Sequence, residues 1–339
     1  MMKNTVLVTG GAGYIGSHVC VELLEQGYTV VVLDNLCNGS EVALQRVQEI
    51  TGKTLIFQRG DVRDGPLMRK LLRDEQVGAV MHFAGLKAVG ESVEQPLEYY
   101  DNNVTGAIDL LQSMRDEGVK TLVFSSSATV YGDPVSNPID ENFPLSATNP
   151  YGRSKLMIEE MLRDLSISDR DWDISILRYF NPAGAHPSGR IGEHPSGIPN
   201  NLMPYIAQTA SGLRQQLSVF GGDYPTRDGT GVRDYIHVTD LARGHIKALQ
   251  KLADKPGCVT HNLGTGTGYS VLELVVAFEH ACGSSIPYEV VPRRPGDIAE
   301  CYADPGSARE ELNWQAEKDL TAMCEDAWRW QQQNPTGYT

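Results

Sequence analysis

The sequence is poor in cysteine and in basic residues, and both deficits exclude classes of protein. Six cysteines are scattered over 339 residues without a C-x-x-C pair, which indicates neither a disulfide framework nor a zinc site. Lys and Arg number 29 against 43 Asp and Glu, and the net charge of −14 argues against sequence-independent binding to nucleic acid. His186 and His194 could be read as a metal pair. No acidic or thiolate partner completes that set, so we expect no metal.

Long hydrophobic runs are also missing, because no stretch approaches the roughly 20 apolar residues of a membrane span. Met1 to Asn4 lead directly into a strand-like run, too short a lead for a signal peptide, so we expect a cytoplasmic protein with no membrane partner. What remains is an ordinary globular composition, with 41% hydrophobic and 21% charged residues. That composition supports a sizeable core, and the length predicts about two domains.

The first half of the chain alternates strand-like and helix-like segments. Continuous apolar strands bury both faces, as in a parallel sheet covered by helices. The alternation predicts an α/β fold with a doubly wound parallel (Rossmann) sheet. The expected strands are Thr5–Thr9, Thr29–Leu33, Leu55–Gln58, Ala79–Phe83, Thr121–Ser125 and Ile174–Arg178.

After Asn181 the chain becomes rich in Gly, Pro, Asn and Ser, with a helix expected over Leu202–Leu213. A second helix is expected over Val238–Leu252, followed by a strand over Val259–Leu263 that rejoins the sheet. The two domains would therefore interleave in sequence. We expect residues 1–181 plus about 234–265 in the larger domain, and about 182–233 plus 266–339 in a smaller mixed α/β domain.

A glycine-rich turn follows the first strand. Gly10, Gly13 and Gly16 allow a tight turn, a close backbone approach to a pyrophosphate, and close packing of the next helix on the strand. The helix N-terminus offers free N–H groups to the anion. Asp34 ends the second strand, 21 residues beyond Gly13, where a carboxylate binds a ribose diol and repels a 2′-phosphate. The pattern therefore predicts NAD rather than NADP, the alternative being an incidental Gly-rich turn.

Asp61 ends the third expected strand. Its carboxylate could accept a hydrogen bond from an adenine amino group. A loop aspartate that forms an Asx-turn explains the residue equally well.

A tyrosine and a lysine share one face of a later helix. Tyr151 and Lys155 are four residues apart, and Pro150 suits the first turn of that helix. A tyrosine that acts as a base near neutral pH needs its pKa lowered from about 10 to about 7, which corresponds to about 4 kcal/mol. A nearby ammonium supplies roughly 3 to 4 kcal/mol at most, so the lysine alone is marginal and an oxidised nicotinamide ring would complete the shift. The alternative is an exposed helix pair.

The glycine turn, S-S-S-A-T-V-Y-G (125–132) and Y-G-R-S-K (151–155) resemble the extended short-chain dehydrogenase/reductase family. Further segments extend this resemblance to the UDP-hexose 4-epimerases of that family over nearly the whole chain. Those segments are H-F-A-G-L-K-A-V-G-E-S (82–92), Y-Y-D-N-N-V (99–104), R-Y-F-N-P-A-G-A-H-P-S-G (178–189), G-I-P-N-N-L-M-P-Y (197–205), D-G-T-G-V-R-D-Y-I-H-V (228–238) and P-R-R-P-G-D (292–297).

This resemblance implies a homodimer with an NAD-binding domain and a smaller UDP-sugar-binding domain. It implies interconversion of UDP-galactose and UDP-glucose through oxidation at carbon 4, rotation of the 4-keto sugar and reduction on its other face. Tyr151 would be the base, Lys155 its activating lysine, and Ser127 the residue that hydrogen-bonds the sugar oxygen. Further cofactor contacts would come from Tyr14, Ile15, Asn35, Asn38, Gly39, Asp61, Val62, Phe83, Ala84, Gly85, Lys87, Asn102 and Phe180. Substrate contacts would come from Asn181, Asn201, Leu202, Phe220, Arg233, Tyr235, Arg294, Asp297 and Cys301.

Two of these assignments have competing interpretations. Arg233 and Arg294 could clamp a diphosphate, because guanidinium groups bind phosphate oxygens in pairs. Otherwise Arg233 would pair with Asp234 or with another acid, and Arg293 and Arg294 would be a solvated surface pair. Cys301 lies where some members of the family carry a bulky tyrosine, and a small residue there would admit UDP-N-acetylglucosamine and UDP-N-acetylgalactosamine. The alternative is a small buried hydrophobic residue.

Three other functions fit the sequence less well. A nucleotide-sugar 4,6-dehydratase would place a carboxylate pair after the fifth strand, where this chain has Ser127-Ala128-Thr129. An oxidoreductase with net turnover would release stoichiometric NADH. A non-catalytic NAD sensor would be expected to lack Tyr151 or Lys155, and both are present.

Overall fold

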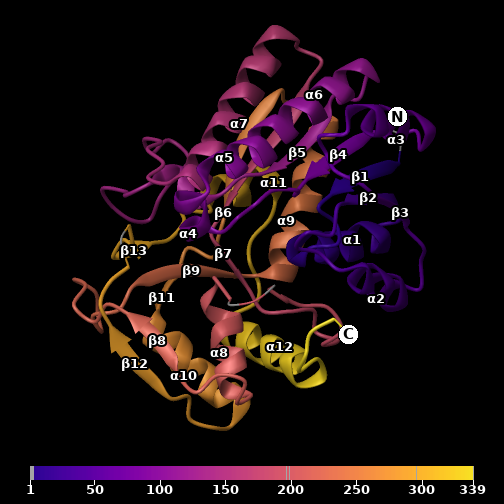
Figure 1. Cartoon of the computed structure of the whole chain (residues 1–339). Helices are drawn as coiled ribbons and strands as arrows, with labels where there is room; N and C mark the ends of the chain where they lie inside the picture. Colours follow the sequence, from indigo (N-terminus) through magenta and orange to yellow (C-terminus); the bar gives the residue numbers. More distant parts are fainter. Residues whose placement is uncertain (1–3, 196, 198, 295, 339) are drawn as a thin grey trace.

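A seven-stranded parallel sheet forms the upper half of the molecule in Figure 1, a computed structural model that describes residues 4–195, 197, 199–294 and 296–338. Met1–Lys3, which entered the expectation about the N-terminus, lie outside the described residues, as do Ile198 and Pro295 of the resembling segments. The strand order is β10-β6-β5-β4-β1-β2-β3. These strands are β1 (Thr5–Thr9), β2 (Thr29–Asp34), β3 (Ile56–Arg59), β4 (Ala79–His82), β5 (Thr121–Ser125), β6 (Asp173–Tyr179) and β10 (Cys258–Leu263).

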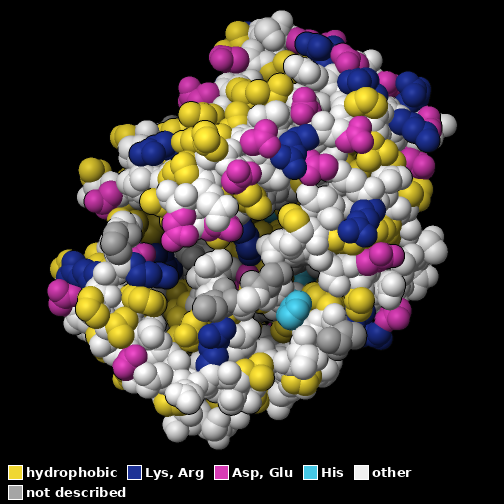
Figure 2. Space-filling model, viewed as in Figure 1, with side chains coloured by type: hydrophobic (Ala, Val, Ile, Leu, Met, Phe, Trp, Pro, Cys, Tyr) yellow, Lys and Arg dark blue, Asp and Glu magenta, His cyan; other side chains and the backbone are white. Residues whose placement is uncertain are grey.

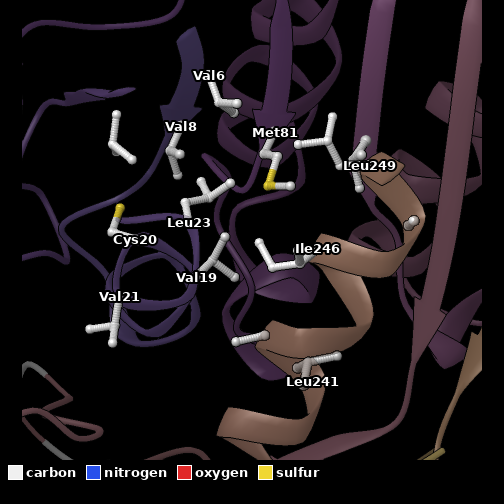
Figure 3. Close-up of a cluster of buried hydrophobic side chains, with 14 of the residues drawn as sticks. Val6, Val8, Val19, Cys20, Val21, Leu23, Met81, Leu241, Ile246 and Leu249 are labelled. Atoms are coloured by element: carbon white, nitrogen blue, oxygen red, sulfur yellow. The ribbon is translucent and has the colours of Figure 1, made fainter. Parts of the chain in front are cut away.

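Both faces of this sheet are buried, which explains why its strands read as continuous apolar runs. In β1, Val6 and Val8 pack into the cluster on one face, and Leu7 packs into the cluster on the other. The first face is covered by α1 (Tyr14–Glu25), α2 (Glu41–Thr51), α9 (Val238–Lys251) and α11 (Gly306–Leu312). The second is covered by α3 (Gly65–Asp74), α6 (Gly106–Asp116) and α7 (Pro150–Ser168). In Figure 3, Val19 of α1 and Ile246 of α9 point toward each other beneath the strands.

The lower half in Figure 1 contains the smaller sheets and the helices α8 (Leu202–Ala210), α10 (Val271–Cys282) and α12 (Leu320–Gln333). β9 (Val232–His237) is the centre of one sheet, in which it pairs with β7 (Asn181–Ala183), β11 (Gly268–Ser270) and β13 (Glu300–Cys301). β8 (Leu217–Phe220) and β12 (Tyr288–Val291) form the other. This mixture of parallel and antiparallel pairs completes the predicted fold class, which is confirmed.

The chain crosses between the two halves more than once. After β6 it enters β7 and the lower half, and it returns through β9, α9 and β10. β10 pairs in parallel with β6, so the strand expected over Val259–Leu263 does rejoin the large sheet. The domain boundaries given above stay a prediction.

One expected helix is shorter than predicted. α8 ends at Ala210 instead of Leu213, because Gly212 adopts a φ of +79° and stops the helix there. The remaining short elements are α4 (Val89–Glu94), α5 (Pro96–Tyr99), a π-helix η1 (Tyr100–Thr105), and the 3₁₀ turns η2 (Ala128–Tyr131) and η3 (Leu252–Asp254). Within the described ranges, no helix has both the length and the apolar character that crossing a membrane requires.

Candidate active site

The order of the large sheet reverses between β1 and β4, and ligands of open α/β sheets bind in the crevice beyond such a reversal. β1 runs into the glycine-rich turn, and β4 runs into the segment from Phe83 to Lys87. A Cβ on Gly10 would lie 2.7 Å from the backbone nitrogen of Ala84, so this position excludes any side chain. In Figure 2 the surface is hollowed between the upper and lower halves of the molecule, beside this edge of the sheet.

The turn itself leaves room for an anion. A Cβ on Gly16 would lie 2.3 Å from the carbonyl oxygen of Gly10, so the third glycine is required for helix packing. A Cβ on Gly13 would meet only that carbonyl, at 3.3 Å, so the second glycine faces open space. Gly13 is the N-cap of α1, and no side chain caps the helix there. Backbone N–H groups at the start of α1 therefore remain for a ligand, which fits the pyrophosphate of a dinucleotide.

Asp34 connects the turn to the end of β2. Its Oδ2 accepts a hydrogen bond from the Ala12 backbone N–H at 3.0 Å, and its Oδ1 accepts one from the Leu36 N–H at 2.8 Å. Burial raises the pKa of the carboxyl above its usual value, and the two backbone donors oppose that rise. Gly39 also packs on the turn, since a Cβ there would lie 3.0 Å from the carbonyl carbon of Ala12. The placement fits the predicted ribose contact, which stays a prediction.

Asp61 is held by Arg63, which lies two residues further along the chain. The Arg63 backbone N–H donates to Asp61 Oδ1 at 3.0 Å, and the guanidinium donates from Nε to Oδ1 and from Nη2 to Oδ2, both at 2.9 Å. These bonds hold the pKa of Asp61 well below its usual range. Asn35 Nδ2 also donates to Oδ2, at 3.0 Å. The Asx-turn interpretation is thus present in the structure, and the adenine contact stays a prediction.

The other predicted cofactor residues lie on several different elements, and their role stays a prediction. Tyr14, at the start of α1 beside Ile15, donates its hydroxyl to the Gly184 carbonyl at 2.7 Å. Lys87 Nζ pairs with Glu193 Oε1 at 3.1 Å. Val62 and Phe180 are buried, and Asn38 lies in the loop between β2 and α2. Asn102 lies in the π-helix. Gly85 lies beside Lys155 of α7, because a Cβ on Gly85 would be 3.8 Å from Lys155 Nζ.

Asn103, the neighbour of Asn102, is not among the predicted site residues. Its side chain is buried, and Oδ1 accepts from the Leu86 N–H at 2.8 Å. Nδ2 donates to the Leu86 carbonyl at 3.0 Å and to Ser154 Oγ at 3.1 Å. Asn103 therefore ties the segment after β4 to α7. The Asn-Asn pair was the available signal in the sequence. Residue type alone does not tell which of the two asparagines is buried with a full set of hydrogen-bond partners.

Tyr151 and Lys155 lie at the start of α7, as predicted. Asn149 caps this helix by accepting from the Gly152 N–H at 2.8 Å, and Pro150 occupies the first turn. Both functional side chains are buried, which excludes the exposed-pair interpretation. Lys155 Nζ lies 6.0 Å from the centre of the Tyr151 ring and donates to the Ser125 carbonyl at 2.8 Å.

The electrostatics of this pair follow from burial. Burial raises the pKa of Tyr151, and a hydrogen bond with the Ser127 side chain opposes the rise. Burial lowers the pKa of Lys155 to about 8, and the charge of Glu159 opposes that fall. Tyr151 is thus a neutral phenol at pH 7 in the chain by itself. This agrees with the expectation that the lysine is insufficient alone, and activation by an oxidised nicotinamide ring stays a prediction.

The predicted diphosphate contacts lie on and beside β9. Arg233 and Tyr235 are two residues apart and so share one face of the strand. Asp234 points to the other face, where Oδ1 accepts from the Thr265 hydroxyl at 2.7 Å and Oδ2 from the Ala303 N–H at 3.1 Å. Arg233 Nη1 instead donates to the Val232 carbonyl at 2.9 Å. The alternative pairing of Arg233 with Asp234 is therefore wrong.

Arg294 reaches the same region from a loop. Its guanidinium stacks 4.7 Å from the centre of the Phe220 ring, and Nε donates to Asp297 Oδ2 at 2.9 Å. Burial raises the pKa of Tyr235 to about 12, and the charges of Arg233 and Arg294 oppose that rise. Both arginines thus act on one buried tyrosine. Because Arg294 is half-exposed and already paired, its surface-residue interpretation stays open.

The remaining predicted substrate residues flank β9. Asn181 pairs with Tyr235 in the register of β7, and Cys301 pairs with Arg233 in the register of β13. Cys301 also packs against the cluster that contains Phe180. Asn201, just before Leu202 and α8, donates from Nδ2 to Glu193 Oε1 at 2.6 Å. Among the residues that the structure describes, no group of three or more His, Cys, Asp or Glu side chains could hold a metal ion.

Residues 6–264 match the NAD dependent epimerase/dehydratase family. The chain belongs to that family, and the predicted resemblance is confirmed. It is 62% identical over 333 residues to the UDP-glucose 4-epimerase of Bacillus subtilis (strain 168), with 98% of each chain covered. It is 59% identical over 344 residues to the UDP-glucose 4-epimerase of Homo sapiens, with 99% of each chain covered. The fold is similar to the crystal structure of UDP-glucose 4-epimerase from Bifidobacterium longum in complex with NAD+ and UDP. For that structure the TM-score is 0.96 and the identity 54%, over 98% of this chain and 99% of that one.

Proposed function

We propose that this chain is a UDP-glucose 4-epimerase that interconverts UDP-galactose and UDP-glucose with NAD as its cofactor. The observation that carries the proposal is the burial of Tyr151, Lys155 and Ser127 together at the edge of the sheet beside the glycine-rich turn. The family is NAD dependent, which agrees with the expected cofactor. Relatives about 60% identical over their full length carry this activity in their names.

NAD would be held by the start of α1, by Asp34 and by the segment after β4. When bound, it supplies the hydride acceptor and donor for carbon 4. Tyr151 takes the proton from the sugar 4-hydroxyl and later returns it, while the Lys155 ammonium stabilises the phenolate. Ser127, whose side chain opposes the rise in the pKa of Tyr151, orients the sugar oxygen. The buried position of Tyr151 keeps bulk water from the transferred proton.

Epimerisation requires the 4-keto sugar to turn over within the site. Binding energy must therefore reside in the nucleotide and diphosphate rather than in the sugar. Arg233 and Arg294 suit that role, because both lie beside Tyr235 and a guanidinium binds phosphate oxygens in pairs. The sugar then meets only the catalytic groups and the walls of its pocket.

The proposal extends to the N-acetylated UDP-sugars. Cys301 lies in register with Arg233, and its side chain is small and packed against the cluster that contains Phe180. Burial raises the pKa of its thiol to about 11, so the Cys301 side chain is uncharged and unreactive at neutral pH. A small side chain next to Arg233 supports the proposal that a 2-acetamido group fits there.

The proposal also includes a homodimer. Val93 on α4, Leu97 on α5 and Met157 on α7 are exposed, and Leu97 is 77% exposed. α4 packs against both α5 and α7, so these side chains belong to neighbouring helices on one surface. Figure 2 shows hydrophobic side chains gathered over α5 and α7. An exposed apolar surface of this kind supports burial against a second copy. The expected cytoplasmic location stays a prediction.

One incubation tests the activity. The purified chain is mixed with UDP-galactose, and separately with UDP-N-acetylgalactosamine, without added cofactor, and the products are separated by chromatography. We expect both 4-epimers to form with no accumulation of NADH. Stoichiometric NADH would indicate an ordinary oxidoreductase. No product even with added NAD would overturn the proposal.

A further inference from the structure

Three consecutive serines at the end of β5 contact three successive turns of α7. The Ser127 side chain lies close enough to the Tyr151 phenol to oppose the rise in its pKa that burial causes. The Ser125 carbonyl accepts from Lys155 Nζ at 2.8 Å. Ser126 Oγ donates to Glu159 Oε1 at 2.5 Å. The serine segment 125–127 thus lies against three helix residues that are spaced by four positions.

Glu159 is fully buried, and both of its oxygens are fully occupied. Oε1 accepts from Ser126 Oγ and from Arg178 Nε, the latter at 3.0 Å. Oε2 accepts from Arg178 Nη2 and from Arg163 Nη2, both at 2.7 Å. These partners hold the pKa of Glu159 below its usual value. A carboxylate with four charge-assisted or hydroxyl donors has one fixed orientation, so it is a rigid anchor for Ser126.

Tyr151, Lys155 and Glu159 are spaced by four residues, so they line one face of α7. The serine segment lies across that face. A small slip of the segment along the helix would therefore change the Ser127–Tyr151 contact and the Lys155–Ser125 contact together. Such misplacements near a reacting group reduce turnover strongly.

We propose that Glu159 is a positioning residue of the active site, which acts through Ser126 to hold Ser127 and the Ser125 carbonyl in register with Tyr151 and Lys155. This inference rests on the proposed function. In this role the fully buried Ser126 hydroxyl links the serine segment to Glu159.

A purely structural role for Glu159 predicts something different. In that case the carboxylate serves to neutralise Arg178, which is itself buried and also bonds to the Tyr131 hydroxyl at 3.0 Å and the Glu141 carbonyl at 3.2 Å. The Ser126 bond is not required for that neutralisation. Removing only the Ser126 hydroxyl leaves the Glu159–Arg178 ion pair intact and so separates the two roles.

The test is Ser126→Ala in the full chain, assayed with UDP-galactose at a temperature well below its melting midpoint. We expect kcat to fall about 10- to 100-fold while KM and the NAD content per chain stay at parental values. The matched control is Glu160→Gln, one position along the same helix, where the side chain is 67% exposed and pairs only peripherally with Arg163 at 3.5 Å. That variant should keep the parental kcat.

Ser126→Cys is the second variant, in case the alanine variant does not fold. It conserves volume but offers a weaker donor, so its kcat should also fall. A folded Ser126 variant with kcat within twofold of the parental value overturns the positioning role, whatever its melting temperature. A parental chain that does not epimerise UDP-galactose overturns the proposed function instead, and the positioning role with it.

Discussion

The carboxylate of Asp34 accepts a hydrogen bond from the Ala12 backbone N–H at 3.0 Å, so the residue predicted to bind ribose also fixes the glycine-rich turn. One side chain thereby couples the cofactor preference to the shape of the anion site. Its second oxygen accepts from Leu36, whose φ of +63° is unusual for a residue with a side chain. The loop beyond β2 therefore depends on the same carboxylate.

Asp34→Asn should weaken NAD binding and improve NADP binding relative to NAD. The amide removes the negative charge that repels a 2′-phosphate. Its NH₂ group would also face one of the backbone N–H donors, of Ala12 or Leu36, that Asp34 now accepts from. We expect at least about a tenfold lower NAD affinity, measured by titration of the cofactor-free chain with each dinucleotide. Unchanged preference for NAD would contradict the assignment of Asp34.

Tyr151→Phe should lower turnover of UDP-galactose by about 1000-fold or more, because general base catalysis typically contributes 10²- to 10⁴-fold. UDP affinity should stay within a fewfold of the parental value, since we assign the binding of the nucleotide and diphosphate to other residues, among them Arg233 and Arg294. Calorimetric titration with UDP checks the second point. Near-normal turnover would reject Tyr151 as the base.

Lys155→Met should change how stability depends on pH. Burial lowers the pKa of Lys155 to about 8 from its ordinary value of 10.5. The unfolded chain therefore binds more protons between these values, so stability rises with pH across that window, and the buried cation destabilises the fold below it by about 3 kcal/mol. Loss of the bond to the Ser125 carbonyl offsets about 1 kcal/mol of the gain in the variant.

We therefore expect the difference in melting temperature, variant minus parent, to be largest near pH 7 and to decrease toward pH 10. Thermal melts at four or five pH values measure it. A difference that is independent of pH would show that the pKa of Lys155 is the same in the folded and in the unfolded chain.

Cys301→Tyr should abolish turnover of UDP-N-acetylgalactosamine and preserve that of UDP-galactose. The phenol ring would fill the space next to Arg233 that we assign to the acetamido group. Cys301→Ser is the matched control and should keep both activities. Unchanged turnover of UDP-N-acetylgalactosamine in the tyrosine variant would contradict the proposed role of Cys301.

Leu97→Asp should convert the dimer to monomer, because it places a charge on the exposed apolar surface, where burial against a second copy would desolvate it. Light scattering after size exclusion measures the mass. Leu213→Asp is the control, since Leu213 is also exposed, at 57%, but follows α8 in the lower half. A parental chain that is already monomeric would count against the proposed homodimer.

The large sheet and the Tyr151–Lys155 pair were predictable because their signals are local. Five of the seven strands, β1, β2, β4, β5 and β6, are short and mostly apolar runs, whereas β3 (IFQR) gives a weaker signal. α7 has a capping asparagine followed by proline. The seventh, β10, was placed only because α9 precedes it with clear helical spacing. In such segments burial, propensity and periodicity agree.

Other features leave no such local signal. β7, β11 and β13 have two or three residues each, which is too short for an alternating pattern. Glu159 reads as an ordinary helix glutamate, and only the fold brings Arg178 and Ser126 to it. The partner of Arg233 was likewise undetermined, because Asp234 is its neighbour in sequence but lies on the opposite face of β9.

The return of the chain through α9 and β10 has a consequence for how this protein can be divided. Leu241 and Ile246 of α9 lie in the same buried cluster as Val19 and Leu23 of α1, and β10 forms the edge beside β6. A fragment that stops after β6 would expose that cluster to solvent and leave β6 as a bare edge. Proteolytic or genetic truncation there should yield an aggregating product rather than an autonomous nucleotide-binding module.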